Sequence, residues 1–194
     1  MSIITEPMTQ AEFEDFLDKV KRYSLATVKG QAAQPLPRSI SLLFVNAKSF
    51  SSESLNQFEK TLNQETGSDM KRWKDGSESA ISEVTEQKLD QNITDDEWEL
   101  LLNKKKEEDI KFAVQKIEDV YKKVIERGKN HPEEREALIA ILNTITGAIK
   151  LVVDIVVSFL EEIARKIWLW LKETFEKIKI TFITVTEAIT NFFG

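Results

Sequence analysis

The chain has 194 residues, with 33 acidic and 27 basic side chains, one His, no Cys and a formal net charge of −6. The lack of Cys excludes disulfide scaffolds, thiolate metal sites and cysteine nucleophiles, and the acidic balance argues against general nucleic-acid binding. With only six Gly and four Pro, and 41% hydrophobic residues, the composition predicts an all-α protein.

The N-terminal region, residues 1–94, is polar and interrupted, which indicates short helices and linkers. It opens without the basic and apolar segments of a secretion signal, so we expect synthesis in the cytoplasm. Thr9 and Glu12 have the spacing of a capping box, and a helix is predicted over about 10–23. Two Pro in the segment 30–37 predict a linker after this helix.

The rest of the N-terminal region gives weaker signals. The apolar run 41–45 is either a strand or a segment that docks on a bundle, and docking is favoured because no second strand is evident for pairing. Ser52 is a candidate N-cap for a helix that should end at Gly67. The stretch 68–92 is rich in Ser, Glu and Lys and has few apolar anchors, so we expect weak helix or mobile linker there.

Residues 95–194 are expected to form a long helical hairpin. A second capping box, Thr94 to Glu97, begins an amphipathic helix over 95–127. Its apolar side chains recur every three or four residues, and the opposite face is charged. Gly128 is expected to end this helix.

The longest helical pattern runs from residue 132 to residue 193. His131 followed by Pro132 is typical of a turn and a helix start, and no further Pro occurs in the pattern. One helix of this length would measure about 93 Å, so either it bends back near Glu161–Lys166 or the protein is elongated. The β-branched run 180–186 is alternatively a strand.

The fold class predicted from these patterns is all-α. We expect an elongated helical bundle or hairpin with a long C-terminal apolar or amphipathic helix and a partly irregular N-terminal third. One long helix and two short ones are too few to cover the apolar surface of the 132–193 pattern. The surplus must therefore meet other copies of the chain, a partner or a membrane.

The segment Ala137–Leu160 is the most apolar part of the chain, with 17 Ala, Val, Ile, Leu or Phe among 24 residues. At about 1.5 Å per residue, it is long enough to cross the roughly 30 Å hydrocarbon core of a bilayer. Charged residues bracket it, and two Trp follow it like an interfacial aromatic belt. The residues expected to face a membrane or another copy are Ile141, Ile145, Ile149, Val152, Val156, Phe159, Trp168 and Trp170.

Two charged residues interrupt this apolar segment. Lys150 and Asp154 are four residues apart, so they can pair on one helical face. Together with Asn143 they define a polar stripe. Such a stripe fits the buried central helix of a soluble bundle, and it also fits a lipid-facing helix that turns its polar side towards sister helices.

The sequence carries no pattern that indicates an enzyme. A Gly-rich phosphate loop, a nucleophile elbow, a zinc-protease motif and a calcium loop are all missing. The acidic clusters at 95–99 and 133–136 lie at helix starts, where the helix dipole explains them. We therefore expect no catalytic residues, no cofactor and no metal site.

These patterns predict a membrane-active helical protein, either pore-forming or membrane-perturbing. It would be stored with its apolar helix covered, expose residues 137–170 on a trigger, and oligomerise so that Lys150 and Asp154 line a polar interior. In architecture alone it resembles α-helical pore-forming toxins and cell-death effectors. The partners expected are other copies of the chain and a lipid membrane, without nucleic acid.

The alternative is a non-enzymatic structural or interaction protein that forms a self-associating helical assembly. In that case Lys150 and Asp154 would form an interhelical pair that specifies the register of the assembly.

Overall fold

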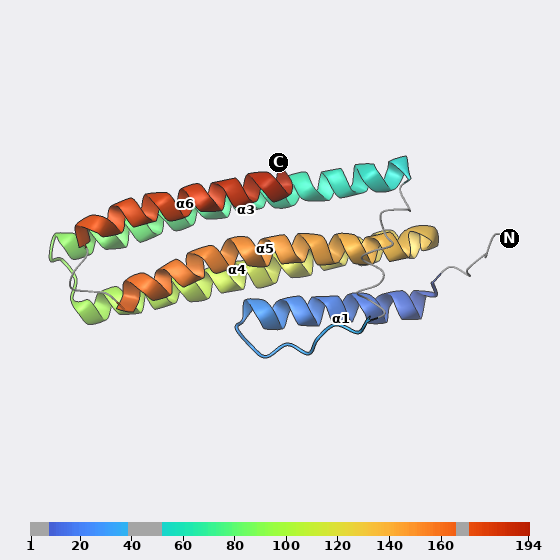
Figure 1. Cartoon of the computed structure of the whole chain (residues 1–194), viewed down its shortest axis with the longest axis horizontal. Coiled ribbons are helices and arrows are strands. Elements are labelled where there is room, and N and C mark those ends of the chain that lie inside the picture. Colours follow the sequence, from blue (N-terminus) through green and yellow to red (C-terminus); the bar gives the residue numbers. More distant parts are fainter. Residues whose placement is uncertain (1–7, 39–51, 166–170) are drawn as a thin grey trace. The chain divides into compact units, whose positions relative to one another are not determined.

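A computed structural model describes residues 8–38, 52–165 and 171–194. This part of the chain contains α-helices and one 3-10 turn but no strand (Figure 1), so the all-α prediction is confirmed. The expected apolar run 41–45 lies outside the described residues. The elements are α1 (Gln10–Val28), α3 (Glu53–Leu89), α4 (Asp95–Asn130), η2 (Pro132–Glu134), α5 (Arg135–Arg165) and α6 (Leu171–Phe193).

Side-chain caps begin three helices at the predicted places. At α1, the Glu12 carboxylate accepts a hydrogen bond from the Thr9 amide at 3.0 Å, and the Thr9 hydroxyl accepts one from the Glu12 amide at 3.3 Å. Thr94 and Glu97 repeat this capping box at α4, with distances of 2.8 and 3.2 Å. The Ser52 hydroxyl accepts a hydrogen bond at 3.0 Å from an amide three residues later in α3. Each cap satisfies amides that the first helical turn leaves free.

Two predicted helix ends are wrong for the same reason. α3 continues past Gly67 and α4 continues past Gly128. A Cβ at Gly67 would lie 2.6 Å from Cβ of Phe193, and a Cβ at Gly128 would lie 2.2 Å from ring carbons of Phe13. These glycines therefore allow another helix to approach closely, and they do not end the helix that contains them.

The expectation of weak helix or mobile linker over 68–92 is also wrong, because α3 extends to Leu89. Its buried residues recur at intervals of three or four, as in any helix that packs on one face. Small polar side chains occupy some of these positions, and they dilute the apolar pattern in the sequence. The buried positions of this stretch are Met70, Trp73, Ser77, Ile81 and Thr85.

The helices contribute to two compact units. Unit 1 comprises 1–62 and 114–147, so it holds α1, the start of α3, the second half of α4 and the first part of α5. The Ser24 hydroxyl of α1 and the Thr146 hydroxyl of α5 are hydrogen-bonded at 3.0 Å inside this unit. Its core includes Phe13, Leu17, Val20, Leu55, Ile117, Val120, Val124, Leu138, Ile139, Ile141, Leu142 and Ile145.

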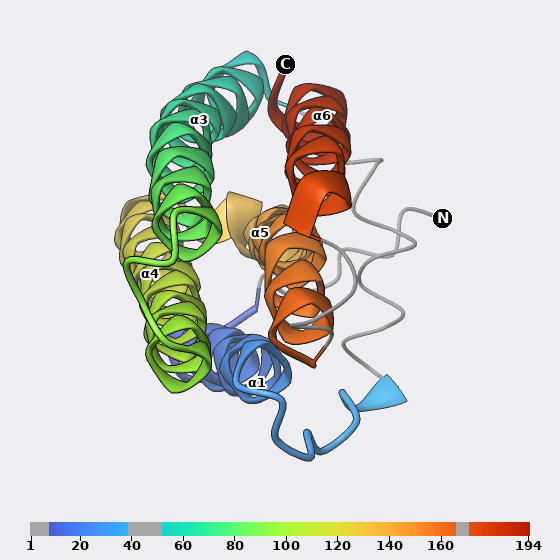
Figure 2. The same cartoon turned by 90° about the vertical axis from the view of Figure 1, so that its left-hand side faces the viewer.

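Unit 2 comprises 63–113 and 148–194. It holds the remainder of α3, the first half of α4, the second half of α5 and all of α6. Figure 2 shows these helices nearly end-on. Its core includes Met70, Trp73, Ile81, Trp98, Leu102, Ile149, Val152, Val156, Phe159, Leu160, Ile178, Phe182, Val185 and Ile189.

Within unit 2 the 132–193 pattern is divided between α5 and α6, which lie side by side (Figure 1 and Figure 2). α5 ends at Arg165 and α6 begins at Leu171, so residues 132–193 do not form one helix. Lys177 of α6 pairs with Glu162 of α5 at 3.2 Å. The β-branched run 180–186 is helical, because successive turns of α6 bury Ile178, Phe182, Val185 and Ile189.

The expected shortage of covering helices is wrong as well. That prediction assumed that one long helix and two short ones had to cover the apolar surface of one continuous helix over 132–193. Instead, α3 has 37 residues, and residues 171–193 form a separate helix that covers α5 within unit 2. Most large apolar side chains of α5 are buried as a result.

Candidate functional site

Six of the eight residues expected to face a membrane or another copy are described, and all six lie inside the protein. The side chains of Ile141 and Ile145 are buried in the core of unit 1. Those of Ile149, Val152, Val156 and Phe159 are buried in the core of unit 2. Trp168 and Trp170 lie outside the described residues. In this state the apolar face of α5 is covered by the other helices.

The polar stripe of α5 contains the expected ion pair. The Lys150 ammonium donates to the Asp154 carboxylate across one helical turn, and the two side chains are 34% and 41% exposed. Both belong to unit 2, whereas half-buried Asn143 belongs to unit 1. The opposite charges of Lys150 and Asp154 therefore neutralise each other within α5.

A groove runs between α5 and α6 in unit 2, with a volume of about 480 Å³. Apolar side chains form much of its wall, hydroxyl groups lie among them, and two carboxylates complete the lining. Both carboxylates have a lysine partner: Asp154 pairs with Lys150, and Glu162 pairs with Lys177. The lining residues are Leu151, Asp154, Ile155, Ser158, Phe159, Glu162, Ile180, Thr181 and Thr184.

The exposed apolar residues of this region were not singled out from the sequence. Leu151 is 49% exposed, Ile180 is 60% exposed and Ile183 is 50% exposed. Leu151 and Ile180 line the groove, and Ile183 lies one helical turn beyond Ile180. A signal was available for the two isoleucines, because both fall outside the buried stripe of α6.

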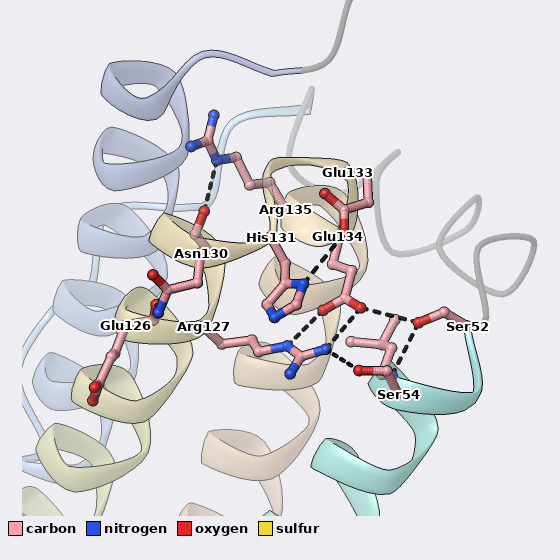
Figure 3. Close-up of polar contacts among 11 residues, drawn as sticks. Ser52, Ser54, Glu126, Arg127, Asn130, His131, Glu133, Glu134 and Arg135 are labelled. Carbon is pink, nitrogen blue, oxygen red and sulfur yellow. Dashed lines mark hydrogen bonds and ion pairs between the residues drawn. The ribbon is translucent and has the colours of Figure 1, made fainter.

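A second polar cluster ties three helices together in unit 1 (Figure 3). Glu134, the last residue of η2 just before α5, accepts two hydrogen bonds from the Arg127 guanidinium of α4, at 2.7 and 2.9 Å. The Ser52 hydroxyl donates a third at 3.0 Å, and Arg127 also donates to Ser54 at 2.6 Å. The Arg127 hydrogen bonds lower the pKa of Glu134 below its usual value, against the opposing effect of burial.

The same cluster includes the one group among the described residues with the spacing of a metal site. His131, Glu133 and Glu134 each offer a ligand atom, and these atoms lie within 4.8 Å of one another. Both oxygens of Glu134 already accept hydrogen bonds from Arg127. A cation would compete with this guanidinium, so the arrangement serves the helix junction better than a metal ion.

A buried carboxylate fixes α3 against α4 in unit 2. Asp109 is fully buried and accepts hydrogen bonds from the Trp73 indole at 2.7 Å and from the Ser77 hydroxyl at 2.9 Å. Lys105 supplies a charge partner from the same helix, and Phe112 stacks on Trp73 with ring centroids 5.4 Å apart. This network sets the register of the two helices.

One described helix, Pro132–Ala164, is long and apolar enough to cross a membrane by length and composition. More than half of its most apolar stretch is buried within the protein. No protein-family model, curated protein or solved structure matches the chain.

Proposed function

We propose that this protein is a non-enzymatic, membrane-active helical protein that uses α5 as its membrane element and oligomerises through it. The observation that carries the proposal is the apolar segment Ala137–Leu160. It has the length needed for a bilayer, and its only charged residues, Lys150 and Asp154, are paired with each other. Charged residues in membrane segments commonly pair in this way, because pairing reduces the cost of leaving water.

In the proposed mechanism the described fold is the stored form. The apolar face of α5 is covered by α1 in unit 1 and by α6 in unit 2, as the Ser24–Thr146 hydrogen bond and the Lys177–Glu162 pair indicate. Release of these helices would uncover α5. Insertion of several copies would turn the Lys150–Asp154 side of each α5 towards its neighbours and away from lipid.

A reversible covalent tether tests this mechanism. The hydroxyl groups of Ser24 and Thr146 are 3.0 Å apart, so replacing both residues with Cys places two thiols within reach of a disulfide. Because the chain has no Cys of its own, this would be its only possible intramolecular disulfide. We expect the oxidised S24C/T146C variant to lose dye release from liposomes, and reduction to restore it.

The matched controls are the S24C variant and the unmodified chain, neither of which can form an intramolecular disulfide. Both should float with liposomes and release dye equally under oxidising and reducing conditions. The proposal is wrong if the unmodified chain neither floats nor releases dye. It is also wrong if the oxidised double variant releases dye as fast as its reduced form.

The second candidate function is a self-associating helical assembly without a membrane. The observation in its favour is the exposed apolar surface at Leu151, Ile180 and Ile183, which a second copy of the chain would bury. Sedimentation of the full chain without lipid tests it. A large species of defined size, together with no flotation, would favour assembly over membrane action.

A further inference from the structure

We propose that the groove between α5 and α6 binds a single acyl chain of a zwitterionic phospholipid. The inference rests on the proposed membrane function for its biological meaning, and it names the lipid group that the protein would contact first. All of the groove lies in unit 2. The length, the lining and the charge of the groove all suit this ligand.

The length of the groove suits one acyl chain. Its α5 wall runs from Leu151 to Glu162, eleven residues further along, which spans roughly 16 Å of helix. The hydrocarbon core of a bilayer is about 30 Å thick, so one layer of acyl chains occupies about half of that length. The volume of about 480 Å³ also falls within the range of roughly 300–1,000 Å³ that is usual for small-molecule sites.

The lining suits a flexible hydrocarbon. Leu151, Ile155, Phe159 and Ile180 supply apolar wall from both helices. Half or more of the surface of the Ile180 side chain, and nearly half of that of Leu151, is open to solvent. An acyl chain in the groove would remove this apolar surface from water, which is the main source of favourable free energy in such binding.

The charges favour a ligand without net charge. Asp154 and Glu162, the two carboxylates of the lining, are each neutralised by a lysine. An anionic headgroup would have to compete with these carboxylates for Lys150 and Lys177. A zwitterionic headgroup makes no such demand, so affinity should come from the acyl chain and depend little on salt.

Calorimetric titration with palmitoyl-lysophosphatidylcholine, below the concentration at which it forms micelles, tests the site. We expect saturable binding that ionic strength does not change. Ile180→Ser should weaken it by roughly tenfold, since a partly buried Ile contributes on the order of 1.4 kcal/mol of apolar contact. Leu100→Ser is the matched control, because Leu100 is 68% exposed on α4 and does not line the groove.

A second variant separates a shaped groove from a merely apolar surface. Thr184→Phe fills the groove while it adds apolar area, so we expect it to abolish lysolipid binding. Binding that stays unchanged or tightens in this variant would overturn the proposal. Salt-independent self-association without lipid, lost in Ile180→Ser, would also overturn it, because a second copy would then cover this surface.

Failure of the groove and failure of the membrane function give different results. If Thr184→Phe releases dye from liposomes as the unmodified chain does and binds lysolipid equally well, the groove assignment fails and the membrane function stands. If the unmodified chain binds lysolipid at the groove but never floats with liposomes, the acyl site stands and the membrane function fails. Circular dichroism of each variant confirms that its helices are intact.

Discussion

Gln91 occupies a left-handed backbone position just after α3, with φ of 58°. The amides of Gln91 and Asn92 bond back to carbonyls of the last helical turn, which is the hydrogen-bond pattern of a Schellman motif. Gly30 has the same role after α1, with φ of 65°. A residue with a Cβ is strained in this conformation, whereas Gly is not.

We therefore expect Gln91→Gly to raise the free energy of unfolding by about 0.5–1 kcal/mol. The reverse change at the equivalent position, Gly30→Ala, should lower it by about 1 kcal/mol, because Ala must adopt the left-handed conformation. Urea unfolding followed by circular dichroism measures both. Equal effects of the two changes would contradict the assignment of these turns.

Glu134 makes the free energy of unfolding depend on pH. Its pKa lies below the usual value of about 4.5, chiefly because Arg127 donates two hydrogen bonds to its carboxylate. A depressed pKa means that the folded state binds the proton more weakly than the unfolded state does. The stabilisation is therefore fully present above the unfolded pKa, and it is lost as the pH falls through the folded pKa.

Glu134→Gln should lower the free energy of unfolding at pH 7 by about 1–3 kcal/mol, the value typical of hydrogen bonds to charged groups. The difference from the unmodified chain should shrink as the pH falls below about 4.5. Glu133→Gln is the control, because that neighbouring side chain is 69% exposed. A difference that stays constant from pH 7 to pH 3 would show that the ion pair does not stabilise the junction.

At the scale of elements, the capping boxes at Thr9 and Thr94 were predictable because a helix start depends on residues a few positions apart. The roles of Gly67 and Gly128 were not predictable, since a glycine that ends a helix and one that admits a neighbouring helix look the same in sequence. The distinction depends on Phe193 and Phe13, which lie far away along the chain.

Replacing two helical glycines with Ala should change the free energy of unfolding in opposite directions. Gly128→Ala gains about 1 kcal/mol of helix propensity, but its Cβ would meet the buried Phe13 ring at 2.2 Å. Overpacking of this kind costs about 1–3 kcal/mol, so a net loss of roughly 1 kcal/mol is expected. Gly147→Ala meets nothing within 4 Å and should gain about 1 kcal/mol.

Thermal unfolding of the Gly128→Ala and Gly147→Ala variants measures whether each change lowers or raises the Tm. A rise in Tm for Gly128→Ala as large as that for Gly147→Ala would show that Phe13 does not pack against α4 as described.

The continuity of α3 illustrates what local patterns miss. Ser77 and Thr85 can be buried because their hydroxyl groups are hydrogen-bonded. Ser77 donates to Asp109 of α4, and Thr85 donates to a carbonyl of its own helix. Neither partner is marked in the sequence around these residues. Apolar periodicity alone therefore underestimated the helix, whereas the strongly apolar α5 was evident from composition.

At the scale of the whole molecule, the sequence indicated the apolar segment but not which helices bury its apolar face. Lys177 pairs with Glu162, and Lys106 pairs with Glu161 at 2.6 Å. The sequence does not distinguish these pairs from the many other combinations of a lysine with an acidic residue. The groove between α5 and α6 was unpredictable for the same reason. It depends on how two helices pack against each other, which spacing along either one does not determine.

Replacing both Lys150 and Asp154 with Leu tests the proposed interior of an oligomer. The two side chains are partly exposed, so stability should change little. Insertion should improve, because each charge costs roughly 2.5–3.5 kcal/mol at the centre of a bilayer. Flotation should therefore increase while dye release falls. Unchanged dye release would contradict the idea that these residues line a pore.

The aromatic residues divide between the two units in a way that has a spectroscopic consequence. All four Trp of the chain fall within the sequence ranges of unit 2, and both Tyr, Tyr23 and Tyr121, fall within those of unit 1. Indole emission excited at the red edge of the absorption band therefore observes unit 2 alone, without any added label. Stopped-flow mixing with lipid, followed by this emission, would time the response of the half of the protein that contains α6 and the groove.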